Sequence, residues 1–446
     1  MTRTKGLENI STRQWRIAKL AREHQDSALT TLSHHMDTDW LREAFRRTRK
    51  DGAVGIDSQT AEEYEAHLEE NLRELLELAQ SGRYRAPAVR RTYIPKADGS
   101  QRPLGIPTFE DKVLQRSVVM LLEPLYEQDF LTCSWGFRPK RSAHGALNQV
   151  WSELTWTGGG WVLDVDLRKF FDTLKHEVLR DILSHRVRDG VVLRLIGKWL
   201  KAGVMEEGVI RPNEDGTPQG GVISPLLANI YLHEVVDEWF ERMIKPHLSD
   251  KAFMVRYADD LVMGFTSKED AMRVLTVLPK RLGKYGLSLH EGKTRLLDFR
   301  RPQRLSKDDE GTGKPGSFDF LGFTHYWSKS RLGKWVIKRK TSRSRLGRAL
   351  QAIDQWCAKN RHHPLSQQQE KLNQKLRGHC AYYGITGNSR SLSRFRKEFL
   401  KRWRGWLSRR SQKGYMSWVK FQKLLERYPI LPPIAIHSIY RRTVNP

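Results

Sequence analysis

Apolar residues recur at helical spacing in the N-terminal part of the chain. In residues 60–80, TAEEYEAHLEENLRELLELAQ, they repeat every three or four positions, which is typical of an amphipathic helix. We therefore expect residues 12–83 to be mainly helical. Residues 84–108 are interrupted by prolines and carry an Asp-Gly pair between two extended segments, which predicts a β-hairpin.

From residue 109 to about residue 300 the pattern alternates between strands and helices. WVLDVDL, residues 161–167, has the period of two that is typical of a strand, so Asp164 and Asp166 share one face. A helix is expected to begin near Asp172. Residues 318–327, FDFLGFTHYW, again have the composition of a strand.

The last part of the chain combines helical periodicity with strong positive charge. Residues 346–358 and 393–407 each place aliphatic or aromatic side chains on one helical face. The formal net charge is +27 for 446 residues. Nearly all of it arises after Lys329, where we count about 29 Lys and Arg against about 4 Asp and Glu. This one-sided charge exceeds what solubility requires and indicates a nucleic-acid partner.

The sequence carries no signal of a membrane or secreted protein. No apolar run is long enough to span a bilayer, and the N-terminus lacks the apolar segment of a signal peptide. Three scattered cysteines favour a reducing compartment without a disulfide framework. We expect a cytoplasmic protein, associated with the nucleoid if the host is a bacterium.

The stretch RYADDLVMG, residues 256–264, places two carboxylates between apolar runs. One interpretation is a tight hairpin turn, in which aspartate bonds the local backbone. The other is a divalent-cation site, because buried carboxylates are costly without a positive partner. A third carboxylate to join Asp259 and Asp260 is available from the strand of residues 161–167, where Asp164 and Asp166 share one face. Such a set suits two Mg²⁺ ions and phosphoryl transfer.

Several further motifs follow in a characteristic order. They are YIPKADGSQRPLGIP (93–107), TPQGGVISPLLANIYLHEVVDEWF (217–240), GLSLHEGKTRLLDF (286–299), FDFLGFTHY (318–326) and LNQKLRGHCAYYG (372–384). Together with the acids, they resemble the reverse transcriptase/maturase proteins encoded by group II introns, over nearly all of the chain. Within the second motif, Ser224 and Pro225 are expected to cap and begin a helix.

The resemblance implies an α+β fold with the right-hand arrangement of polymerases. Residues 1–83 would form an N-terminal helical extension and part of the fingers. Residues 84–330 would complete the fingers and form a palm with an antiparallel sheet. Residues 331–446 would form a helical thumb and a basic, RNA-binding maturase region.

The resemblance also assigns roles at the catalytic centre. The metal-binding set is Asp166, Leu167, Asp259 and Asp260, with two Mg²⁺ ions. Lys293 would face the leaving pyrophosphate, as a charge or as an acid. The dNTP-binding residues would be Lys96, Arg102, Phe171, Gln219 and Gly220.

Each nucleotide-binding role has a physical reason. Lys96 and Arg102 flank the hairpin turn and could reach one triphosphate, although a solvated basic hairpin is an alternative. The ring of Phe171 would clash with a 2′-hydroxyl and favour deoxynucleotides, although a core aromatic at a strand–helix junction is an alternative. Gln219 and Gly220 would let the backbone approach the nucleotide closely.

The C-terminal third supplies the expected nucleic-acid contacts. Leu321, Gly322 and Phe323 would lie against the primer end. The expected RNA-binding residues are Arg377, Arg394, Lys397, Lys401, Arg402 and Arg404. The neighbouring rings of Phe399, Trp403 and Trp406 suit helix packing as well as base stacking.

The predicted function is RNA-directed DNA synthesis on intron RNA, with RNA binding that assists splicing and mobility. Its partners would be structured intron RNA, an RNA template with a DNA primer, and target DNA, without a membrane. Cys357, His362, His363, His379 and Cys380 have no zinc-site spacing, so neither zinc nor an endonuclease domain is expected. The primer would then come from elsewhere, such as a nascent strand.

Two alternatives remain open from the sequence. One is a maturase without enzymatic activity, which the intact acids argue against. The other is a reverse transcriptase of this lineage that serves defence or repair.

Overall fold

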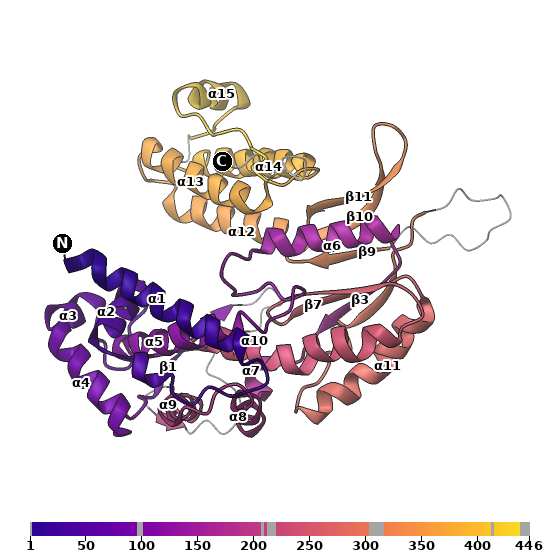
Figure 1. The fold of residues 1–446 in the computed structure, drawn as a ribbon. Coiled ribbons are helices and arrows are strands. Elements are labelled where there is room, and N and C mark those ends of the chain that lie inside the picture. The colour runs from indigo at the N-terminus through magenta and orange to yellow at the C-terminus, as the bar shows by residue number, and fades with distance from the viewer. Residues whose placement is uncertain are drawn as a thin grey trace. The chain divides into compact units, whose positions relative to one another are not determined.

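The computed structural model describes residues 2–95, 101–206, 209–211, 220–302, 316–411 and 414–437. Its contacts divide the chain into two compact units, Met1–Ala146 with Trp161–Leu296, and Leu147–Gly160 with Leu297–Pro446. Both units mix helices and strands, which confirms the predicted α+β class (Figure 1). None of the helices in the described ranges is long and apolar enough to cross a membrane. The three functional segments expected from the sequence stay a prediction.

The first unit begins with the expected helices. They are α1 (Thr2–Glu23), α2 (Thr38–Arg47), α3 (Ala61–Ala66) and α4 (Leu68–Ser81). A capping box starts α3, because the side chain of Thr60 accepts from Glu63 N and Glu63 bonds Thr60 N in return. The long helix α5 (Phe109–Tyr126) packs against α1 and α2 and is buried over most of its length (Figure 1).

The expected hairpin is confirmed by β1 (Val89–Pro95) and β2 (Gln101–Ile106), which pair antiparallel. Their Asp-Gly turn lies outside the described residues. The short strands β4 (Val204–Glu206) and β5 (Val209–Arg211) extend the sheet in the order β2-β1-β4-β5. Gly220 packs closely on this sheet, because a Cβ there would lie 2.5 Å from the carbonyl oxygen of Gly105.

The central sheet of the first unit has the strand order β6-β7-β3-β8. Its strands are β3 (Trp161–Asp166), β6 (Ala252–Tyr257), β7 (Asp260–Phe265) and β8 (Arg295–Asp298). Helix α11 (Lys268–Lys284) contacts β3 and β7 along its length (Figure 1). Buried apolar side chains of β3, β6 and β7 join the helices in one large core.

Four further helices complete the first unit. They are α7 (Phe170–Thr173), α8 (His176–Ser184), α9 (Gly190–Leu200) and α10 (Ser224–Leu232). Ser224, expected to cap α10, is instead its first residue, and Ile223 occupies the cap position without a side-chain bond. From His233 to Ile244 the chain continues as a π-helix, η2. Runs of π-helix this long are rare, and π-helical turns often mark functional sites.

The second unit combines a small sheet with basic helices. Its strands β9 (Ser317–Phe320), β10 (Phe323–Lys329) and β11 (Trp335–Thr341) pair antiparallel in the order β11-β10-β9. Residues 147–157 of α6 (Ala143–Thr157) lie beside this sheet, where Trp151 Nε1 donates to the carbonyl oxygen of Ile337 at 3.0 Å (Figure 1).

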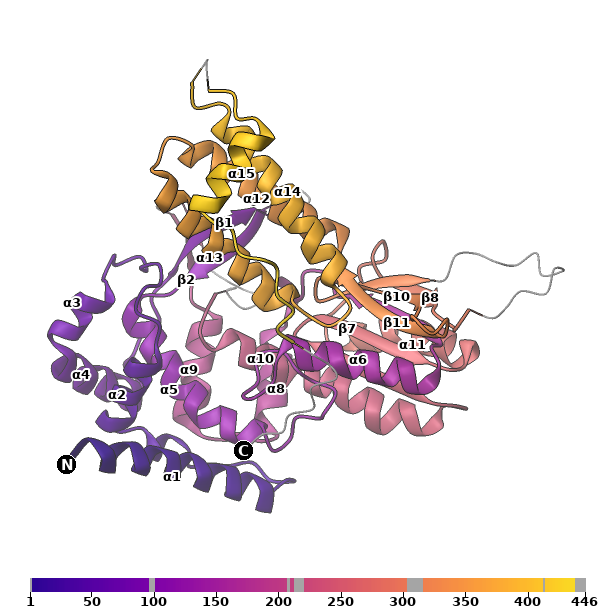
Figure 2. The ribbon, with the colours of Figure 1, turned by 90° about the horizontal axis from the view of Figure 1, so that it is seen from above.

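The helices of the second unit form their own bundle (Figure 2). They are α12 (Arg343–Asn360), α13 (Leu365–Tyr383), α14 (Ser389–Leu407) and α15 (Trp418–Arg427). Phe399 and Trp403 of α14 are fully buried, and Trp406 is half-buried. The first two rings therefore serve the core, which was one of the two uses expected for them.

Candidate active site

The stretch RYADDLVMG forms the hairpin between β6 and β7. Tyr257 pairs with Asp260, so Ala258 and Asp259 make a two-residue turn. Ala258 has a φ of +56°, the left-handed conformation that such tight turns require. The predicted turn is confirmed, and it places Asp259 at the tip and Asp260 at the first position of β7.

The third acid lies on the adjacent strand. Asp166 is the last residue of β3 and is the register partner of Asp260. Directly opposed residues of an antiparallel pair have Cβ atoms about 4.5–5.5 Å apart. The sheet therefore brings Asp166, Asp259 and Asp260 together at one end, as the sequence predicts, although 92 residues separate Asp166 from the turn.

Burial gives Asp259 an unusual electrostatic state. It raises the pKa of this carboxyl above its ordinary value, and the nearby carboxylate of Asp166 adds to the rise. The charges of Arg102 and Arg256 oppose the rise. Asp260 is exposed. The site thus concentrates negative charge at a partly buried point, which a bound cation would stabilise.

Two cationic side chains approach the acids. Lys293 Nζ lies 3.6 Å from Asp166 Oδ2, and Arg102 acts on Asp259 through its charge. The loop before Lys293 is fixed to β3, because His290 N donates to the main-chain oxygen of Asp166 at 2.8 Å. Lys96 and Gln219 lie outside the described residues.

Phe171 occupies α7, directly after β3. Its ring packs edge-on against Phe170 with centroids 5.1 Å apart, and it remains half-exposed. Phe170 is the buried member of the pair and also contacts Tyr231 of α10. The structure therefore buries Phe170 in the core, whereas Phe171 packs against the same core and stays partly exposed.

A buried ionic cluster supports the turn that carries Asp259, and sequence reasoning missed it. Arg256 is fully buried and forms two bonds with Asp237, of 2.7 and 2.5 Å. Its guanidinium also donates to Asn229 Oδ1 at 2.9 Å and to Ser134 Oγ at 2.8 Å. Burial opposes its charge, but Asp237 raises the pKa of Arg256 overall.

This cluster reaches the turn itself. Arg256 Nη1 donates to the carbonyl oxygen of Ala258 at 3.1 Å. The orientation of the turn that carries Asp259 therefore depends on Arg256. The signal in the sequence was a lone arginine in the otherwise apolar strand AFMVRY, where a charge needs a buried partner.

Comparison with known proteins agrees with this geometry. Residues 94–325, just over half of the chain, match the family described as reverse transcriptase (RNA-dependent DNA polymerase). The chain belongs to the reverse transcriptases. Residues 346–424 match the maturase-specific domain of group II introns. The family named by the sequence motifs is thus confirmed, and reverse transcriptase and maturase functions are those of its lineage.

Relatives of this reverse transcriptase occur in bacteria and in fungal introns. Protein YkfC of Escherichia coli is 41% identical over 220 residues, covering 48% of this chain and 57% of YkfC. The group II intron-encoded protein LtrA of Lactococcus lactis is 28% identical, covering 85% of this chain and 74% of LtrA. A 91 kDa protein in the cob intron of Schizosaccharomyces pombe is 41% identical over 154 residues, 34% of this chain and 19% of that protein.

The expected primer-contacting segment of this reverse transcriptase is a second tight turn. Leu321 and Gly322 join β9 to β10 with φ values of +48° and +81°. Tyr382 of α13 donates its hydroxyl to the carbonyl oxygen of Leu321 at 2.8 Å. Phe323 is fully buried beside Tyr382 and Tyr383. Leu321 and Gly322 are therefore the accessible part of this segment, and their contact with primer stays a prediction.

The expected RNA-binding residues differ in how free they are. Arg377, Arg394 and Lys397 are exposed. Lys401 bonds Glu398 at 2.9 Å, and Arg402 lies 3.5 Å from the same carboxylate. Arg404 donates to Met416 and stacks over the ring of Trp418, 4.3 Å from its centroid. The first three residues therefore have more freedom to contact RNA than the last three, which already have partners in the protein.

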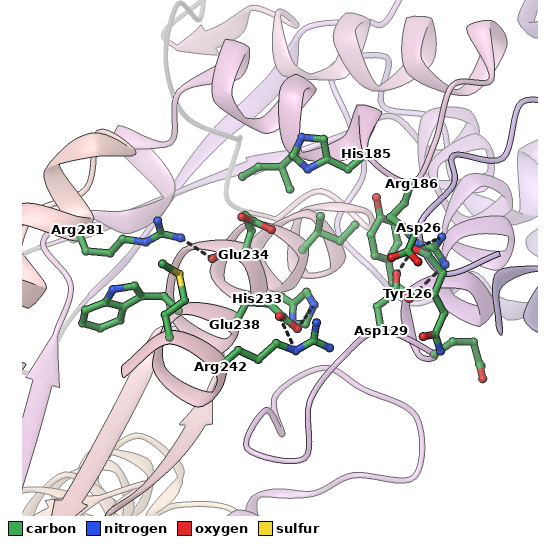
Figure 3. Close-up of a pocket in the computed structure, with 16 residues that line it drawn as sticks. Asp26, Tyr126, Asp129, His185, Arg186, His233, Glu234, Glu238, Arg242 and Arg281 are labelled. Atoms are coloured by element: carbon green, nitrogen blue, oxygen red, sulfur yellow. Dashed lines mark hydrogen bonds and ion pairs between the residues drawn. The ribbon is translucent and has the colours of Figure 1, made fainter. Parts of the chain in front are cut away.

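A cavity of about 430 Å³ lies beside η2 (Figure 3). Asp166, Asp259 and Asp260 are not among the residues that line it. His233 lines it, and its ring nitrogens lie 3.9 Å from Asp237 and 3.4 Å from Glu238. Burial is the main reason that the pKa of His233 falls to about 4. The cavity mixes acids with arginines such as Arg186 and Arg242, so its lining does not select one class of ligand.

No group of three or more His, Cys, Asp or Glu side chains in the described part of the chain is arranged as a preformed metal site. The free cysteines Cys133, Cys357 and Cys380 are each buried. The two magnesium ions expected from the sequence therefore belong to the proposal below.

Proposed function

We propose that this protein copies intron RNA into DNA by phosphoryl transfer at Asp166 and Asp259, and that it binds the same RNA to assist splicing and mobility. The observation that carries the proposal is the pairing of Asp166 with Asp260 beside the turn that holds Asp259. Neighbouring strands thereby supply carboxylates to one point, and the nearby cations Lys293 and Arg102 would bind phosphates.

The donor set fits magnesium. Mg²⁺ prefers hard oxygen ligands and takes few carboxylates together with substrate phosphates. Asp166, Asp259 and Asp260 offer such oxygens, and Leu167, whose side chain is buried, would offer its main-chain carbonyl. The raised pKa of Asp259 indicates an acid that gains from a nearby cation. When bound, two Mg²⁺ ions would stabilise charge on the attacking and leaving oxygens.

The remaining residues would select and orient the nucleotide. Arg102, with Lys96, would hold the triphosphate, and Lys293 would meet the pyrophosphate as it leaves. Phe171 would exclude a 2′-hydroxyl with its accessible side. Gly220 supports this arrangement indirectly, since its lack of a side chain lets its own backbone lie close to Gly105 on the hairpin that carries Arg102.

The larger arrangement follows the same proposal. The hairpin and the N-terminal helices would act as fingers, and the sheet with the acids as palm. The second unit would act as thumb and as RNA-binding region, since residues 346–424 match the maturase-specific domain and its helices are basic.

Primer extension tests the polymerase directly. Wild type should extend a DNA primer on an RNA template with dNTPs and Mg²⁺, and Asp259→Ala should not. Asp164→Asn is a matched control, because Asp164 lies two residues before Asp166 on the same strand face and is 3.5 Å from Arg295. Asp166→Asn should abolish extension, and Asp164→Asn should largely preserve it.

The maturase match supports a second candidate, a splicing cofactor without polymerase activity. Folded wild-type protein that binds structured intron RNA and promotes its splicing, but makes no DNA product, would favour that candidate. DNA synthesis without any preference for intron RNA would instead favour a role in defence or repair.

A further inference from the structure

Phe137 presents a large apolar ring from a loop that is otherwise tightly held. Its φ is +56°, a left-handed conformation that is rare for a bulky side chain. The residue is also 59% exposed. Single exposed apolar residues are common, so exposure alone carries no argument. A strained backbone kept by its surroundings is different, because such positions concentrate at functional sites.

The loop of Phe137 is fixed to the catalytic turn. Trp135 N donates to the carbonyl oxygen of Arg256 at 2.8 Å, and Asn229 Nδ2 donates to that of Gly136 at 2.7 Å. Gly136 packs so closely that a Cβ there would lie 2.4 Å from Ala258 N. Asn229 and Arg256 are also the residues that hold the turn. The loop and Asp259 are therefore positioned by one buried cluster.

The ring of Phe137 lies near that of Tyr257, the residue before the tight turn. The two ring centroids lie 6.5 Å apart, with the planes tilted by 41°. Tyr257 is half-exposed and precedes Asp259 by two residues. The two rings thus form an aromatic surface directly beside the turn that bears Asp259.

We infer that Phe137, together with Tyr257, holds the 3′-terminal nucleotides of the DNA primer strand; this inference rests on the proposed polymerase function. The primer's 3′-hydroxyl must reach Asp166 and Asp259, so the primer end is the nucleic acid nearest the turn. Uncharged rings suit the flat faces of sugars and bases and are poor partners for a triphosphate. Phe137 is a positioning residue, since it would act on the primer next to the reacting hydroxyl.

The test measures primer binding and nucleotide use separately. Phe137→Ala should weaken binding of a recessed-end RNA–DNA duplex roughly ten-fold, as expected when one aromatic–nucleotide contact is lost. Fluorescence anisotropy in Ca²⁺, without dNTPs, gives the duplex Kd. Steady-state extension gives the KM for duplex, which should rise by the same factor, and the KM for dNTP, which should stay within two-fold of wild type.

Two further variants separate the ring from its backbone strain. Phe137→Gly also removes the ring but relieves the left-handed φ, so a ring contact predicts the same loss as Phe137→Ala. Recovery of binding in the glycine variant would overturn the inference. Met272→Ala controls for loss of an exposed apolar side chain on α11 and should bind normally.

The outcomes distinguish this inference from the polymerase proposal. Unchanged duplex Kd in Phe137→Ala refutes the primer contact even if wild type extends primers. A rise in the KM for dNTP with unchanged duplex binding would assign Phe137 to the nucleotide site and also refutes it. Wild type that makes no product refutes the polymerase proposal, while the anisotropy arm still measures whether Phe137 contacts a primer end.

Discussion

Asp259 shows at the scale of one residue how position decides chemistry. From the sequence, RYADDLVMG could be a hairpin turn or part of a metal site. The geometry confirms the turn, and its acids are also placed where they could hold a metal ion. Asp259 lies in a tight turn, yet burial raises its pKa where an ordinary turn aspartate would meet water. Burying a carboxylate costs free energy, and a bound cation would offset that cost.

Phe171 offers a test of substrate choice by a single side chain. Phe171→Ala should admit ribonucleotides, because the clash with the 2′-hydroxyl disappears. The ratio of rNTP to dNTP incorporation, from kcat/KM for each, should rise roughly ten-fold or more. Phe171→Tyr keeps the bulk and should keep the wild-type ratio. An unchanged ratio in Phe171→Ala would assign this ring to packing alone.

His233 predicts an acid-dependent loss of stability. Burial lowers its pKa from 6.5 to about 4 in the folded protein, assisted by the charges of Arg256, Arg242 and Arg138, while Asp237 opposes the change. The folded state therefore favours the neutral ring. Its contribution to stability is complete above pH 6.5 and is lost as the pH falls toward 4, amounting to about 3 kcal/mol.

The measurement is chemical denaturation of wild type and His233→Gln at pH 7.5 and pH 4.5. The glutamine cannot titrate, so its loss of unfolding free energy between the two pH values should be smaller than that of wild type. Equal losses in the two proteins would mean that other groups cause the acid sensitivity.

At the scale of elements, the sequence pattern predicted the strand and the hairpin that carry the candidate catalytic acids. Alternation in WVLDVDL located β3, and apolar runs around two aspartates located the β6–β7 hairpin. The cluster of Arg256, Asp237 and Asn229 could not be predicted in the same way. Its members come from β6, η2 and α10, and periodicity within one element says nothing about which buried charges will meet.

The contact between Gly220 and the β1–β2 hairpin makes an element-scale prediction. Gly220→Ala should move the loop away from the sheet, because φ is +118° and the added Cβ would lie 2.5 Å from the main-chain oxygen of Gly105. We expect kcat/KM for dNTP to fall, with duplex binding largely retained. Gly197→Ala in α9 is the matched control, since a Cβ there meets nothing within 4 Å.

The control variant carries its own expectation. Alanine inside a helix is favoured over glycine by about 0.5–1 kcal/mol, so Gly197→Ala should be as stable as wild type or more stable, and fully active. Activity in Gly220→Ala equal to that of Gly197→Ala would show that the loop tolerates displacement and that its contact with the hairpin is dispensable.

At the scale of the whole chain, the excess positive charge begins close to the start of the expected thumb and maturase segment, residues 331–446. Nearly all the excess of Lys and Arg follows Lys329, and the maturase-specific match begins at residue 346. Composition alone indicated a nucleic-acid partner for this region. Composition could not indicate which Lys and Arg side chains are engaged in ion pairs. Pairs such as those of Glu398 with Lys401 and Arg402 depend on side-chain geometry on α14.

The salt dependence of RNA binding distinguishes basic side chains on α14 that pair with Glu398 from those that do not. Arg394 and Lys397 are exposed on α14, and no ion pair to either is formed within the described ranges. Each phosphate contact contributes nearly one unit to the slope of log K against log salt concentration. The double variant Arg394→Gln/Lys397→Gln should therefore reduce that slope by about 2 for structured intron RNA and weaken binding most at low salt.

The double variant Lys401→Gln/Arg402→Gln removes the same charge and serves as its control. Lys401 and Arg402 already pair with Glu398, so each gains less free energy from a phosphate contact. The slope should therefore change by clearly less than it does for Arg394 and Lys397. Equal changes would mean that RNA responds to the overall field of the region. A larger change in the second pair would mean that RNA displaces Glu398 from both bases, and Glu398→Gln should then strengthen binding.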